Sequence, residues 1–214
     1  MKGYIGALLE LVLFFGVYGF IVNNTTLSTI EKISCYWLGF TVLTGLWEIV
    51  YLTSRNQVNI YSQQLIKTMT HVWTNNYGLT MLFPWNFSKL FYSEYAAWAD
   101  REYMYYKDDW SSTVEGSHCL MCGFFSLVTL VCMLCGNNVG FLMSLALAMG
   151  SQLMNSILYL EQYLTQCYVP SNVNYNTQQF PCGKFLSQRI FMWINLLWIL
   201  MPTYTLCIYL YKEL

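Results

Sequence analysis

Five long stretches of apolar residues are the feature that most limits what this chain can fold into. They lie at about 4–22, 35–52, 119–135, 139–160 and 190–211, and contain two charged residues, Glu10 and Glu48. About 17–25 mostly apolar residues in a helix cross a lipid bilayer. We therefore predict an all-α integral membrane bundle of five transmembrane helices, with spans at about 4–22, 35–54, 111–135, 139–160 and 190–211.

The overall composition agrees with a membrane protein. Of the 214 residues, 56% are apolar and 10% are charged, whereas a soluble domain carries about 25% charged residues. A formal net charge of −1 offers no positive field for binding nucleic acid. The chain shows no internal repeat and no low-complexity segment, so we predict a single membrane domain over residues 1–214.

The first stretch resembles a signal peptide but is better explained as a retained helix. Its apolar run of about 19 residues exceeds the usual signal core of about 7–15 residues, and it carries Glu10. Asn23, Asn24 and two threonines follow it instead of a clear small-residue cleavage site.

The connection over residues 53–110 is expected to be a long interfacial loop between the second and third helices. It carries ten charges, five of each sign, and many aromatic residues. Its short apolar piece, 79–85, is too brief to span and is interrupted by Pro84. The aromatic residues expected to anchor it at the membrane surface are Trp73, Trp85, Tyr92, Tyr95 and Trp98.

The cysteines do not predict a metal site. Cys119, Cys122, Cys132 and Cys135 have a zinc-like spacing, but along one helix the two pairs lie about 20 Å apart and cannot close one tetrahedron. We interpret them as small packing residues. Whether Cys167 and Cys182 form a disulfide stays open, as does the sidedness, because the Lys and Arg count and the balanced charge of the long loop do not agree on it.

Polar residues recur at membrane depth on four of the predicted spans. Such groups are costly in lipid and usually face a cavity or a partner. The residues on these faces are Thr44 and Glu48; Glu115 and His118; Gln152, Asn155, Ser156 and Tyr159; and Asn195, Trp198 and Pro202. Interhelical hydrogen bonding alone would explain Gln152, Asn155 and Ser156. It explains two carboxylates without a basic partner less well, so we predict one shared pocket.

Several segments together resemble the emopamil-binding protein family, which includes sterol 8-to-7 isomerases and the sigma-2 receptor. The similar segments, over about residues 35–214, are Trp47-Glu48, Glu94-Tyr95-Ala96, Asp100-Arg101-Glu102-Tyr103, Asp108-Asp109, Val114-Glu115, Gln152 with Leu158-Tyr159-Leu160, and the N-x-x-W-x-x-x-P run from Asn195 to Pro202. Their order and spacing carry the resemblance, because no single motif is specific.

The resemblance implies roles for particular residues. Glu48 and Glu115 match the two glutamates around the substrate's double bond, and Asn195 and Trp198 match the pocket-lining asparagine and tryptophan. The family's histidine precedes the first glutamate by four residues, where this chain has Thr44. His118 stands where the family has a threonine, so the two residue types are interchanged.

The leading hypothesis is a cofactor-independent isomerase that shifts a carbon–carbon double bond in a sterol or related terpenoid. Glu48, Glu115 and His118 would be catalytic, and Thr44, Gln152, Ser156, Tyr159, Asn195 and Trp198 would bind the substrate. The face of Trp198 would stabilise a carbocation. Two alternatives stay open: a membrane-bound terpenoid cyclase with the same acid chemistry, and a non-catalytic sterol or lipid binder.

The expected partners are a hydrophobic sterol or terpenoid ligand and the lipid bilayer. No metal, cofactor or nucleic acid is expected, and a homodimer stays open. We expect a multi-pass protein of the endoplasmic reticulum membrane.

Overall fold

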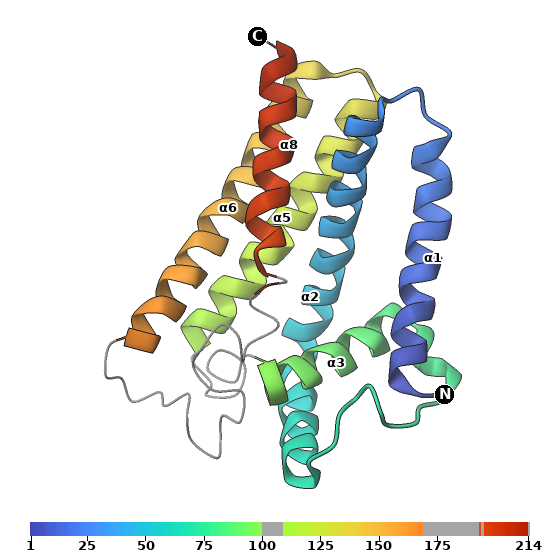
Figure 1. The fold of residues 1–214 in the computed structure, drawn as a ribbon, viewed down its shortest axis with the longest axis vertical. Helices are drawn as coiled ribbons and strands as arrows, with labels where there is room; N and C mark the ends of the chain where they lie inside the picture. The colour runs from blue at the N-terminus through green and yellow to red at the C-terminus, as the bar shows by residue number, and fades with distance from the viewer. Residues whose placement is uncertain (100–108, 169–192, 194, 214) are drawn as a thin grey trace. The chain divides into compact units, whose positions relative to one another are not determined.

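The described part of the chain is all-helical. The computed structural model describes residues 1–99, 109–168, 193 and 195–213, and the side chains of these except residues 99, 109–115, 162–168, 212 and 213. Four helices in this part are long and apolar enough to cross a membrane (Figure 1): α1 (Gly3–Asn23), α2 (Thr29–Thr68), α5 (Asp109–Leu134) and α6 (Asn138–Tyr168). A shorter helix, α8 (Leu197–Glu213), is also apolar.

Each of the first four predicted spans corresponds to one of these helices, but the bounds differ. The second helix begins at Thr29 and continues beyond the predicted end at 54 to Thr68. The first part of the loop expected at 53–110 is therefore helical. The fourth helix likewise continues beyond 160 to Tyr168. For the fifth span, residues 190–192 and 194 lie outside the described residues, and the helix itself begins at Leu197.

The early start of α2 has a local cause. The backbone N–H of Ser28 donates to Oε2 of Glu31 at 2.9 Å, and the Glu31 N–H points back at the Ser28 hydroxyl oxygen at 3.4 Å. This reciprocal arrangement is a capping box, which satisfies N–H groups that have no partner inside the helix. The helix therefore begins before the apolar run does.

The extension of α2 to Thr68 depends on packing. Val58, Ser62 and Leu65 follow one another at spacings of four and three residues, and each is at most 1% exposed. Such spacing places them on one face of a helix. Gln63 and Gln64, which lie between Ser62 and Leu65, are exposed. Mean hydropathy therefore misses this half of the helix, although its buried residues keep a helical period.

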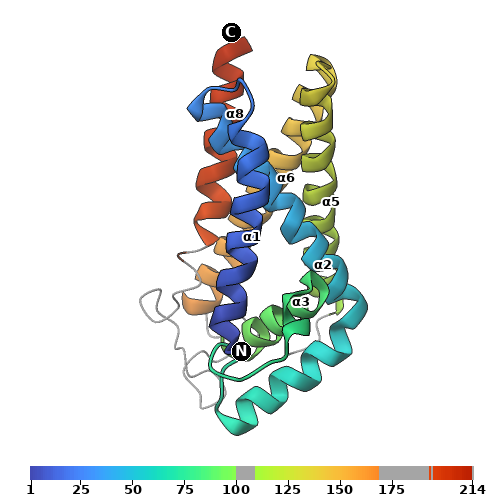
Figure 2. The same cartoon turned by 90° about the vertical axis from the view of Figure 1, so that its right-hand side faces the viewer.

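The chain contacts form two compact units, which are described separately: residues 1–21 with 47–116, and residues 22–46 with 117–214. In the first unit, α3 (Pro84–Glu94) lies alongside the second half of α2 and near the start of α1 (Figure 2). The 3-10 helix η1 (Leu79–Leu82) precedes α3, and the π-helical turn η2 (Tyr95–Ala99) follows it.

The apolar piece 79–85 is divided near Pro84, as the sequence suggested: η1 ends at Leu82 and Pro84 begins α3. Proline suits the first helical position because the N–H it lacks has no partner there. In the part of the expected interfacial loop that the structure describes, Trp85 is exposed and Tyr92 is not: its hydroxyl turns to Glu48. Tyr92 is half-buried and contacts Glu48, and the anchoring of these aromatic residues at the membrane surface stays a prediction.

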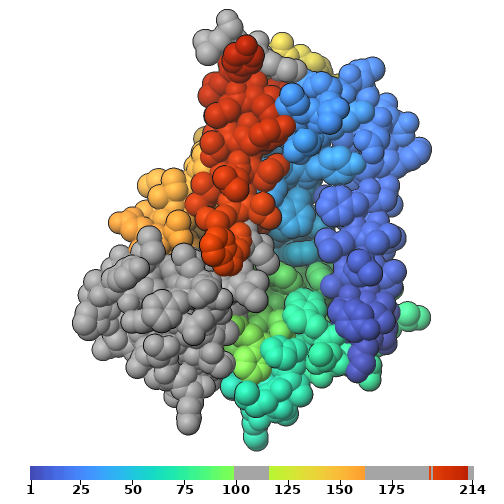
Figure 3. Space-filling model, viewed as in Figure 1, coloured from blue at the N-terminus to red at the C-terminus, as the bar shows by residue number. Residues whose placement is uncertain are grey.

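The start of α1 is bound to the segment before η1. The N–H groups of Gly3 and Tyr4 donate to the carbonyls of Asn75 and Trp73 at 3.0 and 3.1 Å. A Cβ on Gly3 would lie 2.1 Å from the Val72 carbonyl oxygen, so only glycine permits this approach. Beyond this contact, the apolar side chains of α1 are largely exposed, as the blue surface in Figure 3 shows. Lipid is the solvent that suits such a surface.

The second unit is built from the first part of α2 with α5, α6 and α8, and α6 packs against α8. Its buried core contains Trp37, Leu38, Phe141, Leu145, Ala148, Met149 and Tyr209. The turn between α5 and α6 requires Gly136, whose φ is +68°, and Asn137 then caps α6 by accepting the Gly140 N–H at 3.0 Å. Short loops of this kind make neighbouring helices antiparallel.

Candidate functional site

In the first unit, the candidate residue Glu48 is a buried carboxyl group beside tyrosines. Its exposure is 3%, and the hydroxyl of Tyr92 donates to its Oε2. The ring of Tyr51, one helical turn later on α2, stacks on that of Tyr92 with centroids 4.7 Å apart. Because α3 carries Tyr92, the position of α3 determines the environment of Glu48.

Trp47 fixes α3 in that position. Its ring packs against those of Phe87 and Phe91, at centroid distances of 5.2 and 5.5 Å. The hydroxyl of Ser88, which is fully buried, donates to the Trp47 carbonyl at 2.8 Å. Two consecutive residues of α2 thus contact α3 in different ways: Trp47 packs against its phenylalanines, and Glu48 accepts a hydrogen bond from its Tyr92.

Glu94, at the end of α3, is bonded to the segment that follows α2. Its Oε1 lies 2.7 Å from Nδ1 of His71, and its Oε2 accepts the Val72 N–H at 2.8 Å. The His71 ring also packs against Trp98 at 4.9 Å. The glutamate of the Glu94-Tyr95-Ala96 segment therefore has a structural role, because it joins the end of α3 to residues 71 and 72.

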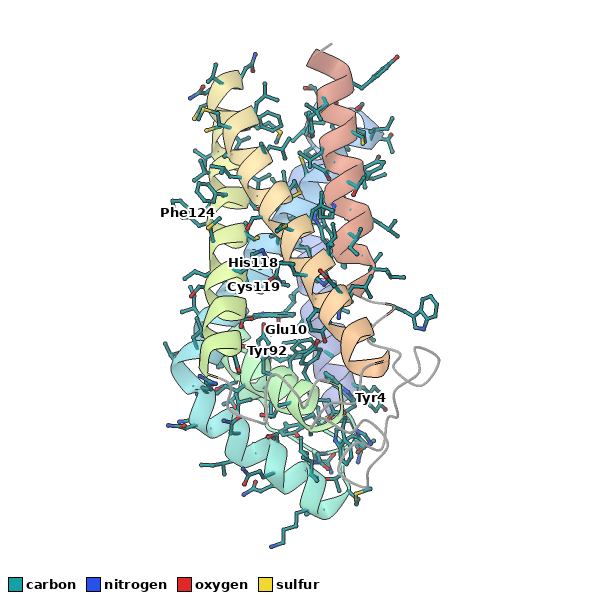
Figure 4. The ribbon with its side chains drawn as sticks, turned by 90° about the vertical axis from the view of Figure 1, so that its left-hand side faces the viewer. Tyr4, Glu10, Tyr92, His118, Cys119 and Phe124 are labelled. Atoms are coloured by element: carbon teal, nitrogen blue, oxygen red, sulfur yellow. The ribbon has the colours of Figure 1, made fainter. Side chains whose placement is uncertain are left out.

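In the second unit, His118 bridges α5 and α6. Its Nε2 lies 2.9 Å from the Ser151 carbonyl oxygen and 3.3 Å from Sγ of Cys122. Cys122 in turn donates to the Ala148 carbonyl at 3.7 Å. Figure 4 shows His118 on the side of α5 that faces α6, whereas Phe124 points away from the bundle.

The polar stripe of α6 is also bonded within the second unit. Oε1 of Gln152, which is 2% exposed, accepts the indole N–H of Trp37 at 2.9 Å. The hydroxyl of Ser156 lies 2.8 Å from the Gln152 carbonyl and 3.3 Å from that of Trp198. These bonds tie α6 both to α2 and to α8.

Three aromatic rings gather beside that stripe. The ring of Trp198 lies 4.9 Å from that of Trp37 and 5.9 Å from that of Phe40. Trp37 and Phe40 were not among the residues expected from the sequence, although Trp37 provides the partner of Gln152. An indole N–H in an apolar helix is the signal that could have identified it, since buried indoles usually find an acceptor.

The other expected site residues are located as follows. The Thr44 hydroxyl donates to the Thr41 carbonyl of its own helix at 3.1 Å. Tyr159 and Asn195 are half-buried in the second unit. The backbone of Glu115 belongs to α5, but its side chain lies outside the described residues, as do the side chain of Cys167 and all of Cys182.

The predicted convergence of the candidate residues on one cavity stays a prediction. Glu48 and Glu115 belong to the first unit, whereas His118, Asn195 and Trp198 belong to the second. What the structure does bring together is Glu48 with Tyr92, His118 with Ser151 and Cys122, and Gln152 with Trp37. Tyr92 and Ser151 could not have been found by spacing, because each is far along the chain from its partner.

Comparison with known proteins gives no match to a family model, a curated protein or a solved structure.

Proposed function

We propose that the chain is a membrane enzyme that shifts a carbon–carbon double bond in a sterol or related terpenoid. The observation that supports this proposal most is the burial of the Glu48 carboxyl group at the middle of α2, where Tyr92 donates to it. Ionisable groups inside membrane helices are rare and usually functional. The proposed location is the endoplasmic reticulum membrane.

The reaction needs one proton donor and one acceptor. A donor protonates one alkene carbon, a carbocation forms at the neighbouring carbon, and loss of a different adjacent proton places the double bond one position further on. No electrons enter or leave. Glu48 suits the acceptor role, because Tyr92 donates to its Oε2, which is therefore already a hydrogen-bond acceptor. Glu115 is the proposed donor, on the resemblance of its sequence segment.

Carbocations are stabilised by the faces of aromatic rings. Trp198, Trp37 and Phe40 form such a group in the second unit, and a desolvated cation–π contact contributes about 2 kcal/mol or more. We propose that Trp198 faces the cation, and that Asn195, Tyr159 and Thr44 line the substrate's path.

One observation favours a second candidate, a non-catalytic sterol or lipid binder. Hydrogen bonds to protein partners are made by Gln152, Ser156 and Thr44, as expected of residues that only stabilise helix packing. A binder would need no more than an apolar surface beside them.

The test is solvent deuterium incorporation. The purified chain in lipid nanodiscs is incubated in D2O with a Δ8 sterol, and the product is analysed by mass spectrometry. Isomerisation gives a Δ7 sterol that is one mass unit heavier, because the added proton comes from exchangeable groups. An epoxy-prenyl substrate is supplied in parallel, and its conversion to a ring would favour the cyclase alternative.

The matched variants are Glu48→Gln and Glu161→Gln. Glu48 is buried and Glu161 is exposed on α6, so both lose a carboxyl group but only one loses the proposed base. We expect Glu48→Gln to slow turnover by about a hundredfold or more, the usual range of acid–base contributions. Sterol binding without any deuterated product from the wild-type chain would leave the binder as the function.

A further inference from the structure

The two ring nitrogens of His118 have different environments in the second unit. Nε2 faces two acceptors: the Ser151 carbonyl oxygen at 2.9 Å and the Cys122 sulfur at 3.3 Å. The thiol hydrogen of Cys122 is directed to the Ala148 carbonyl. A bare lone pair on Nε2 would point at a carbonyl lone pair, so Nε2 must carry the hydrogen.

Nδ1 has the opposite character. It is buried and has no hydrogen-bond partner among the described residues. A neutral imidazole carries one hydrogen, so with Nε2 protonated Nδ1 is an acceptor.

We propose that His118 is fixed as the Nε2–H tautomer, and that its Nδ1 accepts a hydrogen bond from the hydroxyl group of an otherwise apolar ligand. Water is scarce inside a bilayer, so an unpaired acceptor there is best satisfied by a donor that a lipophilic molecule carries with it. Of the expected ligands, a hydroxylated sterol or terpenoid alcohol has this chemistry.

This inference rests on the proposed function for its ligand class, and it changes the role of His118 within it. A ring whose Nδ1 is bare cannot supply a proton from that atom. His118 is then an anchor that orients the ligand, and proton transfer is left to the carboxyl groups. The tautomer itself follows from the contacts of Nε2 alone.

The tautomer can be measured directly because the chain has two histidines. Full-length protein labelled with 15N-histidine in nanodiscs gives two imidazole spectra by NMR, and His118→Gln removes one of them, which assigns both. We expect the neutral ring of His118 to carry its hydrogen on Nε2 and not on Nδ1. An Nδ1–H tautomer or an imidazolium in the ligand-free protein would overturn the inference.

The ligand is tested with cholesterol and its 3-O-methyl ether, in which a methyl group replaces the donor hydrogen. We expect cholesterol to shift the Nδ1 resonance and the ether not to, with binding of the ether about three- to tenfold weaker, the range of one net hydrogen bond. An equal response to both sterols, or no response to either, would refute the ligand role.

His118→Gln is the matched variant because the glutamine amide reaches the position of Nε2. It can therefore still donate to Ser151, whereas it has no atom at the position of Nδ1. We expect this variant to keep its unfolding temperature and lose the preference for cholesterol over the ether. These measurements involve no turnover, so a chain that fails to isomerise sterols can still show the preference, and an isomerase can still lack it.

Discussion

Replacing Gly45 with alanine tests a close backbone approach between α2 and α5 in the second unit. A Cβ at Gly45 on α2 would lie 3.0 Å from Cα of Gly123 and 3.2 Å from the carbonyl oxygen of Cys119, both on α5. Carbon atoms pack best at about 3.5–4.0 Å. The methyl group therefore requires the two helices to separate, since backbone atoms cannot turn aside as a flexible side chain would.

The size of the effect follows from two opposing contributions. Alanine in place of glycine stabilises a helix interior by about 0.5–1 kcal/mol, and inserting a methyl group into a packed site costs about 1–3 kcal/mol. Gly150→Ala on α6 is the matched control, because nothing lies within 4 Å of the Cβ it would carry. The helix contribution is common to both variants, so their free energies of unfolding should differ by about 1–3 kcal/mol.

The assay is reversible unfolding of the full chain in mixed micelles, followed by circular dichroism. We expect Gly150→Ala to unfold at or above the wild-type midpoint and Gly45→Ala below it, with Gly45→Leu lower still. Equal midpoints for Gly45→Ala and Gly150→Ala would show that α2 and α5 do not approach closely at Gly45 and Gly123, and would refute this packing.

Three further predictions concern local contacts. Tyr92→Phe removes the hydroxyl that donates to buried Glu48 and should lower the free energy of unfolding by about 1–3 kcal/mol; Glu48→Gln should lessen this effect, which a double-mutant cycle would measure. Ser28→Ala removes the hydroxyl that contacts the Glu31 carboxylate and N–H in the capping box of α2 and should cost about 0.5–2 kcal/mol, with hydrogen exchange faster in the first turn; unchanged exchange there would contradict the cap. Burial, together with the hydrogen bond to Tyr61, raises the pKa of Tyr77 above its ordinary value. The folded state then holds a proton that the unfolded state releases, so this stability is complete below about pH 10 and is lost as the pH rises further; Tyr77→Phe should show a shallower alkaline loss of stability than the wild type, and identical slopes would exclude the contribution of Tyr77.

The carboxyl group of Glu48 was identified from the sequence, but its partner was not. A charged residue in an apolar run is visible in any sequence, because lipid penalises it wherever the helix lies. Tyr92 looked like one of several aromatic residues suited to the membrane surface. It reaches Glu48 because Trp47 packs on Phe87 and Phe91 and so fixes α3, a set of contacts that spacing along the chain does not predict.

The polar stripe on α6 was likewise identified from the sequence, whereas its partners were not. Its period of three to four residues placed Gln152 and Ser156 on one face, as the helix geometry requires. Whether these residues would serve a ligand or other helices was open. In the structure, Gln152 accepts from Trp37 and Ser156 contacts the Trp198 carbonyl. These bonds are tertiary, so they could not be read from one helix.

The sequence by itself therefore determined the all-α class, four apolar helices of spanning length and the buried position of Glu48, because these depend on local hydropathy and on periods within one segment. The tertiary structure decided where α2 ends, that Pro84 begins a helix, and which atom each polar group meets. The extension of α2 to Thr68 buries Val58 and Leu65, and His118 turns Nε2 to a carbonyl on α6. Burial and hydrogen bonding depend on residues far along the chain, and only the folded arrangement brings those residues together.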